Sequence, residues 1–361
     1  MRFIDEYRDK ELIKKLAGKI EKAAKNEYTF MEVCGGHTSA IHRFGIPFLL
    51  PGKIKLISGP GCPVCVTGKD FIDKTIACSR MENVVIATFG DLIRVPGSSS
   101  TLEGERARGA DIRIVISCLE ALEIARMNPL KKIIFPGIGF ETTAPGTAVT
   151  IKQSEKDKIN NFWILSAHKV MPPAMEAIIK DGADIDGFIC PGHVAAVTGS
   201  SVFNFIPRKY KLGCVITGFE PVDILQAVLM LVNQKNLDKP EVEIQYDRVV
   251  TENGNDIAIR YMTEVFEPCD AYWRGIGIIP SSGLKLRKSY ERFDAEKTFS
   301  PDIMPPEDDG LCVCGEILRG KKTPGDCPLF AGLCTPDNPV GACMVSNEGA
   351  CNTWYKYKRD E

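Results

Sequence analysis

Cysteine is the residue whose number and spacing indicate chemistry most clearly in this sequence. The chain of 361 residues has 14 cysteines, and six of them gather near its C-terminal end: Cys312, Cys314, Cys327, Cys334, Cys343 and Cys351. Four thiolates are enough to hold one zinc ion or one iron–sulfur cluster, and the other two could form a redox-active disulfide. No histidine occurs in this segment, which excludes a mixed Cys/His zinc finger. The spacing does not choose between cluster and zinc, nor say which four cysteines are ligands.

A C-x-x-C motif, formed by Cys62 and Cys65, follows the predicted strand 54–58. A structural zinc site would need a second pair of ligands nearby, and the next pair begins only at Cys312. We therefore favour a reversible dithiol or disulfide at this motif, while coordination of a soft metal by the same two thiols stays open.

Cys34 stands alone in the motif Cys34-Gly-Gly-His-Thr38, where the predicted strand 29–33 passes into a helix. The amides and positive end of that helix should lower the pKa of the thiol and favour the thiolate, which attacks electrophiles or binds metal. The two glycines would let a bulky ligand approach the backbone, and His37 could hydrogen-bond the ligand or the thiolate.

Five predicted strands lead directly into a polar motif rich in glycine and proline. The motifs are Cys34-Gly-Gly-His-Thr38, Gly59-Pro-Gly-Cys-Pro-Val-Cys65, Gly139-Phe-Glu-Thr-Thr-Ala-Pro145, Pro191-Gly-His-Val194 and Gly218-Phe-Glu-Pro221. Turns alone would explain the glycines but not the recurring Cys, His, Glu and Thr. Because ligands of parallel sheets bind outside the carboxyl ends of the strands, we expect one cleft lined by these motifs.

Four further residues in these motifs and beside them carry alternatives that the sequence leaves open. Glu141 and Glu220 could act as acid or base, or could simply stabilise the first turn of the following helix. His168 and His193 could be catalytic. For His42, a partly exposed position on a helix is the better interpretation.

The elements that position these motifs indicate an α/β protein. Predicted strands at 29–33, 54–58, 84–88, 112–117 and 132–135 are followed by a second series at 162–165, 188–190 and 214–217. Helical stretches at 119–127, 173–180 and 221–232 lie between them, which predicts parallel sheets. From residue 240 onward we expect strands at 242–246 and 257–261, and then a region too poor in apolar periodicity to build its own core.

We therefore expect two parallel-sheet α/β domains facing a cleft, followed by a cysteine-rich C-terminal domain. Residues 1–27 should form an amphipathic helix packed on the body. The first α/β domain should span 28–150, the second 151–238, and the C-terminal domain 239–361.

The overall composition is that of an ordinary soluble protein. Lys plus Arg is 45 and Asp plus Glu is 47, and this near-neutral balance argues against nucleic acid as the main partner. No apolar run is long enough to span a bilayer, and the charged N-terminal segment does not resemble a secretory signal. We expect a cytoplasmic protein.

Taken together, the motifs resemble those of the HypD family of hydrogenase maturation factors. The five motifs above carry the resemblance, together with Trp273-Arg-Gly-Ile-Gly277, Ser282-Gly-Leu284 and the six-cysteine tail ending in Glu348-Gly-Ala-Cys351. They occur in order along essentially the whole chain. One departure is Gly68-Lys69, where the family pattern leads us to expect a proline.

The resemblance implies a role in assembling the Fe(CN)2CO group of [NiFe] hydrogenases, on a redox-active scaffold formed with the small chaperone HypC. HypE would donate cyanide, with HypF upstream. Cys34 would hold the iron beside the Cys62 and Cys65 dithiol, while His37 and Thr38 would donate hydrogen bonds to cyanide. A [4Fe-4S] cluster would be bound by Cys312, Cys327, Cys334 and Cys351, and Cys314 and Cys343 would form the extra disulfide.

Two functions from other classes remain as alternatives. One is an iron–sulfur thiol–disulfide reductase that acts on a protein substrate. The other is a zinc-stabilised binding module without redox chemistry.

Overall fold

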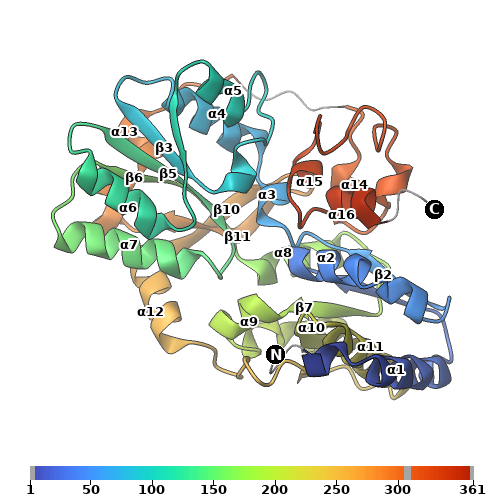
Figure 1. Cartoon of the computed structure of the whole chain (residues 1–361). Helices are drawn as coiled ribbons and strands as arrows, with labels where there is room; N and C mark the ends of the chain where they lie inside the picture. The colour runs from blue at the N-terminus through green and yellow to red at the C-terminus, as the bar shows by residue number, and fades with distance from the viewer. Residues whose placement is uncertain (1–4, 305–309, 358–361) are drawn as a thin grey trace.

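The computed structural model describes residues 5–304 and 310–357, which contain two parallel sheets, an antiparallel hairpin and a cysteine-rich C-terminal region (Figure 1). This arrangement confirms the predicted α/β class with two parallel sheets. Residues 1–4, 305–309 and 358–361, which belong to the expected segments 1–27 and 239–361, lie outside the described residues.

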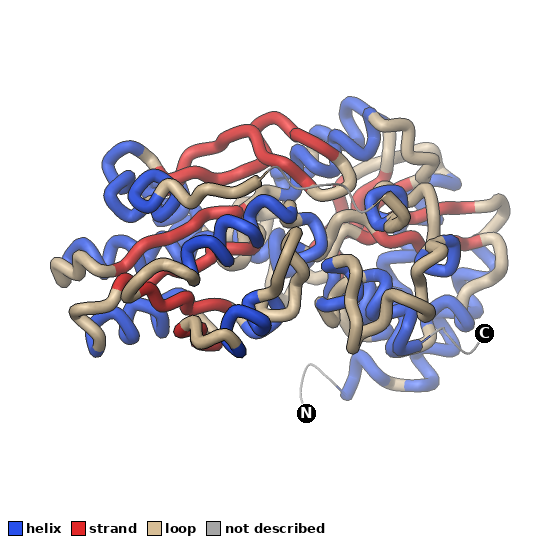
Figure 2. The backbone as a smooth tube through the Cα atoms, turned by 90° about the horizontal axis from the view of Figure 1, so that it is seen from above, coloured by secondary structure: helices blue, strands red, loops and turns tan. Residues whose placement is uncertain are grey.

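The two sheets consist of parallel strands that are mostly buried. Sheet A has the order β2 (Ile54–Ser58), β1 (Tyr28–Glu32), β7 (Gly187–Pro191), β8 (Gly213–Thr217) and β9 (Val242–Ile244). Sheet B has the order β4 (Asp111–Ile114), β3 (Val84–Thr88), β5 (Lys132–Gly139) and β6 (Phe162–His168). The hairpin pairs β10 (Phe266–Trp273) with β11 (Gly277–Leu286). Figure 2 shows the strands in two groups, on either side of the molecule.

The helices pack against both faces of these sheets. In chain order they are α1 (Lys10–Ala23), α2 (Gly35–Arg43), α3 (Pro63–Val66), α4 (Lys69–Ser79), α5 (Leu102–Ala107), α6 (Cys118–Met127), α7 (Ala144–Lys156), α8 (Met171–Lys180), α9 (Gly192–Thr198), α10 (Phe205–Tyr210), α11 (Pro221–Asn236), α12 (Asp256–Val265), α13 (Ala295–Phe299), α14 (Cys314–Leu318), α15 (Ala342–Val345) and α16 (Ala350–Tyr357). Among the described residues, no helix is both long and apolar enough to cross a bilayer.

Side-chain alternation along the strands explains how both faces of each sheet are covered. In β3, Val85 and Ala87 pack with α6 and α7, whereas Val84 and Ile86 pack with α4 and α5. Sheet A follows the same rule, with α1, α2 and α11 on one face and α8, α9 and the C-terminal region on the other. The predicted N-terminal amphipathic helix is α1, which buries Leu16 and Ile20 and packs against α11.

The sheets do not follow the contiguous segments 28–150 and 151–238, because the chain passes between them more than once. β1 and β2 build one side of sheet A, the next four strands build sheet B, and β7 and β8 return to sheet A. β9, which we placed in the C-terminal segment, is the edge of sheet A. Strand pairing over such distances in the chain leaves no local signal in the sequence.

One predicted strand is wrong. Residues 257–261 belong to helix α12, whose N-cap Asn255 accepts a hydrogen bond from the backbone nitrogen of Ala258 at 3.0 Å. The polar residues that we interpreted as a hairpin turn therefore include a helix N-cap. A short apolar run such as this one does not distinguish strand from helix by periodicity alone.

The C-terminal region shares its core with the rest of the protein. Its buried residues Ile317, Leu318 and Met344 belong to the same apolar cluster as Met31 and Phe188 of sheet A. Figure 1 shows α14, α15 and α16 beside α2 and α3, which lie far away in the sequence. This packing brings the cysteine-rich tail to the carboxyl ends of β1 and β2.

Candidate functional site

Cys34 lies at the carboxyl edge of sheet A, where β1 passes into α2. It is the N-cap of that helix, with extended backbone angles, and its carbonyl accepts from the backbone nitrogens of His37 and Thr38 at 2.8 and 3.1 Å. Its side chain is partly buried. The structure therefore confirms the strand-to-helix position that the sequence predicts for this thiol.

The C-x-x-C motif lies directly beside Cys34. Cys62 and Cys65 are disulfide-bonded at the start of α3, and both are buried. The backbone nitrogen of Gly35 donates to the carbonyl of Gly61 at 3.0 Å. A methyl group at Gly61 would lie 2.2 Å from the Cys34 nitrogen, so only glycine permits this approach of the two loops.

Glu32, which the sequence analysis did not single out, is the buried carboxylate of this site. It accepts hydrogen bonds from the backbone nitrogen of Cys34 at 3.0 Å and from the hydroxyl of Thr38. Burial raises the pKa of Glu32 to about 8. The signal that could have revealed it is an ionisable residue within the otherwise apolar strand β1.

The C-terminal region contributes a second carboxylate, Glu348, next to Cys34. A methyl group at Gly35 would lie 2.4 Å from the β-carbon of Glu348, which explains the need for glycine at that position. Glu348 and Ser346 also line a pocket of about 260 Å³ together with Pro63 and Val64 of α3. Gly139, Thr142 and Thr143 complete its wall from sheet B. The α3 segment that follows sheet A, sheet B with its loops, and the tail therefore meet at one pocket, whose lining does not include Cys34, Cys62 or Cys65.

The electrostatic environment of Cys34 differs from the sequence prediction. The amides of Gly36 and His37 do favour the thiolate, as expected at a helix N-terminus. Burial and the carboxylates of Glu348 and Glu32 outweigh them and raise the pKa of the Cys34 thiol to about 12. The expected depression of the pKa is therefore wrong, because tertiary packing buries the thiol and brings Glu348 beside it, and Glu32 lies only two positions before it in the chain.

His37 and Thr38 are not free to donate to a ligand. His37 Nε2 faces the carbonyls of Thr217 and Gly218 at 3.3 and 3.0 Å, and its ring stacks on Phe219. Because both partners are acceptors, Nε2 must carry the proton. Burial lowers the pKa of His37 to about 4, so the ring is neutral. The Thr38 hydroxyl donates to Glu32, so the structure corrects the expectation that either side chain donates to cyanide.

Three residues of the remaining motifs make structural contacts near the carboxyl ends of the strands. His193 also stacks on Phe219, and the centroids of the His193 and Phe219 rings are 4.1 Å apart. Glu220 is the N-cap of α11 and bonds to Arg8, which agrees with a capping role. Glu141 does not cap α7, and instead accepts from the first amide of α8, that of Met171, at 2.9 Å.

His42 and His168 have structural surroundings. His42 is partly buried on α2, as predicted, and its ring contacts Trp354. His168 is buried, with Nε2 3.3 Å from the Thr147 hydroxyl and Nδ1 3.1 Å from that of Ser166. It does not face the pocket beside Cys34.

The six tail cysteines line one small cavity. Cys312, Cys314, Cys327, Cys334, Cys343 and Cys351 surround it, and the other lining residues include Ile317, Leu329, Phe330 and Met344. Within residues 5–304 and 310–357, no three Cys, His, Asp or Glu side chains come close enough to hold a single metal ion. Six thiols that converge on one apolar cavity supply the number and type of ligands that a cluster needs.

The hairpin connects the two cysteine sites. The backbone nitrogen of Arg274 donates to the carbonyl of Val66, at the end of α3, at 2.8 Å. Its neighbour Gly275 packs on Gly315, where an added methyl group would lie 2.2 Å from the α-carbon. Gly315 follows Cys314, so a single backbone segment touches both sites.

Comparison with known proteins agrees with this arrangement. Residues 11–358 match the family HypD, described as "Hydrogenase formation hypA family". The chain is 45% identical over 369 residues to the hydrogenase maturation factor HypD of Azotobacter vinelandii, covering 99% of this chain and 97% of that protein. It is 44% identical over 372 residues to HypD of Escherichia coli strain K12, covering 100% and 99% of the two chains. HypD of Cupriavidus necator is also 44% identical, over 370 residues, covering 99% and 98%. On this similarity and these motifs, the chain belongs to the HypD family of hydrogenase maturation factors.

Proposed function

We propose that this protein is the scaffold on which, together with a HypC-type chaperone, the Fe(CN)2CO group of [NiFe] hydrogenase is assembled in the cytoplasm. The observation that carries this proposal is the position of Cys34. A single partly buried thiol lies against a C-x-x-C disulfide, beside two carboxylates and a pocket shared by both sheets and the tail. This combination suits a metal cargo that must be held, modified and released.

Cys34 would hold the iron through its thiolate. Low-spin Fe(II) binds cyanide, carbon monoxide and soft thiolates, so one protein thiolate is a suitable anchor. Burial raises the pKa of both Glu32 and Glu348, and a cationic metal on Cys34 would favour their ionised forms, whereas an anion would oppose them. Glu32 also holds the loop that carries Cys34 in place, because its side chain accepts a hydrogen bond from the Cys34 amide.

Cys62 and Cys65 would supply two electrons close to the cargo. Reduction of their disulfide takes up two electrons and two protons and gives two thiols, and reoxidation returns them. Both sulfurs are buried, which disfavours attack by an exposed thiol of a protein substrate. This burial supports the scaffold over the alternative of a disulfide reductase for protein substrates.

Cys312, Cys327, Cys334 and Cys351 would hold a [4Fe-4S] cluster, which supplies one-electron transfer when bound. Cys314 and Cys343 would form a second dithiol, and their thiols lie beside each other in the cavity. The protein's own contribution is to exclude water, because the cavity is lined by apolar side chains. HypE, with HypF upstream, would deliver cyanide to the pocket.

The test of the proposal is the substitution Cys34→Ser in protein purified anaerobically with its HypC-type chaperone. We expect normal folding and chaperone binding but no cyanide or carbonyl infrared bands, because a serine hydroxyl stays protonated and is a harder donor. Cys118→Ser is the matched control, since this buried thiol of α6 lies beside the Thr147 and Thr150 hydroxyls of α7. Infrared bands in Cys34→Ser without added reductant would exclude the anchor role. Bands that return only after dithiol treatment would indicate a redox shuttle instead.

A further inference from the structure

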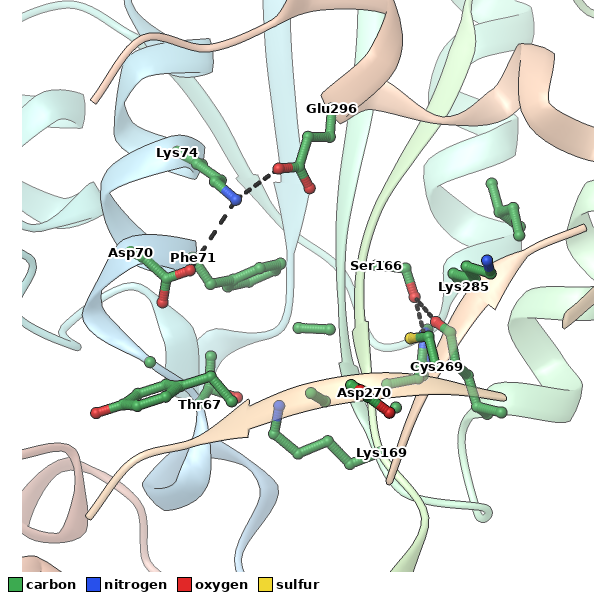
Figure 3. A pocket seen from close by; sticks show the side chains of 18 of the residues that line it. Thr67, Asp70, Phe71, Lys74, Ser166, Lys169, Cys269, Asp270, Lys285 and Glu296 are labelled. Atoms are coloured by element: carbon green, nitrogen blue, oxygen red, sulfur yellow. Dashed lines mark hydrogen bonds and ion pairs between the residues drawn. The ribbon is translucent and has the colours of Figure 1, made fainter. Parts of the chain in front are cut away.

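A second pocket, of about 240 Å³, takes no part in the proposed function. It is enclosed by β6, α4 and the β10–β11 hairpin (Figure 3). Its apolar walls include Phe71, Tyr272, Leu284 and Leu286. A pocket of this size accommodates a small organic molecule rather than a nucleotide or a peptide.

Lys169 is the polar group of this pocket that lacks a polar partner. Its side chain lines the pocket although the residue is only 5% exposed. The ammonium lies 5.7 Å from the ring centroid of Trp273. Within residues 5–304 and 310–357, it makes no hydrogen bond or ion pair. The ammonium is not a fully buried atom, so within the pocket it is open to solvent, and an anion that enters the pocket would take the place of that solvent.

The other charged groups of the lining are already engaged. Lys74 pairs with Glu296 at 2.5 Å, and Lys285 pairs with Glu267 at 3.2 Å. Asp270 accepts from the backbone nitrogen of Ser281 at 3.0 Å. Figure 3 shows Lys74 and Glu296 joined to each other, apart from Lys169.

Two neighbours influence Lys169 from a greater distance. Asp70, on α4, and Cys269, on β10, both favour its charged form, but burial outweighs them and lowers the pKa of Lys169 to about 8. Asp70 is itself 4.0 Å from Lys74. No side chain of the pocket lining therefore accepts a hydrogen bond from the Lys169 ammonium.

We propose that this pocket binds a small monocarboxylate, whose carboxylate accepts a hydrogen bond from the Lys169 ammonium. A single negative charge matches the single unpartnered cation, whereas Asp70, Asp270, Asp294 and Glu296 in the lining would repel a dianion. The apolar walls suit a short alkyl group. The ligand carboxylate would take the place of solvent at the ammonium.

This pocket is close to the C-x-x-C segment but is a separate site. Thr67, which lines the pocket, donates its hydroxyl to the carbonyl of Pro63 at 2.8 Å, across the C-x-x-C helix α3. Cys62 and Cys65 do not line the pocket. Failure of this proposal would therefore leave the role of Cys34 untouched.

The experiment is a calorimetric titration of the full-length protein with sodium propionate, compared with sodium sulfate at equal ionic strength. We expect propionate to bind and sulfate not to bind. The substitution Lys169→Met keeps most of the apolar stem and should weaken propionate binding about tenfold or more, because it removes a charge-assisted hydrogen bond. Lys152→Met removes a lysine charge outside the pocket and should change the affinity by less than about twofold.

A second measurement decides the question even if Lys169→Met does not fold. Reductive methylation of lysines in the wild-type protein by formaldehyde and dimethylamine–borane, which releases no carboxylate, is followed by mass spectrometry, with and without propionate. Propionate should slow the modification of Lys169 at least several-fold and leave that of Lys152 unchanged. Equal rates at Lys169 in both conditions, or sulfate binding as tight as propionate binding, would overturn the proposal.

Discussion

Gly61 packs its backbone against the backbone of Cys34, at a distance where an added methyl group would lie 2.2 Å from the Cys34 nitrogen. The loop before the C-x-x-C helix and the loop that carries the lone thiol thus form one unit. The hydrogen bond from the Gly35 amide to the Gly61 carbonyl fixes the position of one loop relative to the other. Cys34 and the disulfide therefore cannot move independently.

We predict that Gly61→Ala separates these loops. The methyl group would meet backbone atoms, which cannot move aside as a flexible side chain can, so we expect a loss of about 3 kcal/mol in the free energy of unfolding. Urea denaturation followed by fluorescence measures this loss. Gly52→Ala is the matched control, since an added methyl group there has no atom within 4 Å. Equal stability of the two variants would show that the loops are not tightly coupled.

Cys327→Ala tests the proposed cluster. Cys327 lines the six-cysteine cavity and belongs to the same apolar cluster as Leu329 and Met344. We expect loss of iron and sulfide, and a less stable C-terminal region, because metal binding contributes folding free energy directly. Analysis of iron and acid-labile sulfide in anaerobically purified protein is the measurement, with Cys118→Ser as the control that retains both. A full complement of iron in Cys327→Ala would remove this residue from the ligands.

Cys314→Ser and Cys343→Ser should behave differently from Cys327→Ala. The Cys314 thiol lies beside those of both Cys312 and Cys343, and its pairing with Cys343 as an electron-carrying dithiol is what the family resemblance implies. We expect the visible absorption of the cluster to persist in both variants, while maturation of a co-expressed hydrogenase falls at least about tenfold. Cluster loss as complete as in Cys327→Ala would mean that the four ligands and the extra pair were assigned wrongly.

The sequence predicted the position of Cys34 well because the signal is local. An apolar β-rich run followed by Cys34-Gly-Gly-His-Thr38 indicates a strand end and a helix start, and β1 and α2 lie there. The same holds for Cys62 and Cys65 at the start of α3. Both motifs depend on backbone conformation within a few residues.

What the sequence could not predict depends on contacts between distant residues. The pKa of Cys34 is raised partly by Glu348, which is more than 300 positions away in a segment without regular periodicity. The hydroxyl of Thr38 is engaged by Glu32, a residue that is conspicuous only once the strand is known to be buried. The pairing of β1 with β7 likewise has no sequence signal.

His168 provides the last prediction, which concerns stability against pH. Ser166 donates its hydroxyl to the carbonyl of Leu284 at 3.0 Å, so it must accept from His168 Nδ1, and Thr147 faces the lone pair of Nε2. Burial lowers the pKa of His168 to about 3. Below its ordinary pKa of about 6.5, the unfolded chain therefore binds a proton that the folded protein does not bind.

The stability that neutral His168 contributes is fully present above pH 6.5 and is lost as the pH falls toward 3. Between pH 7 and pH 5.5 the expected loss is about 1 kcal/mol for one such histidine. His37, whose pKa is also lowered by burial, adds a loss of the same sign. We therefore expect His168→Gln to lower the free energy of unfolding at pH 7. Between pH 7 and pH 5.5 that free energy should fall by about 1 kcal/mol less in the variant than in the wild type, because the variant lacks one such histidine. Urea midpoints at pH 7, 6 and 5.5 measure this slope in both proteins. Glu32, whose pKa is raised to about 8, contributes with the opposite sign in this range, but it does so equally in both, so the difference between the two slopes reports on His168. A slope in His168→Gln as steep as in the wild type would mean that His168 is protonated in the folded protein.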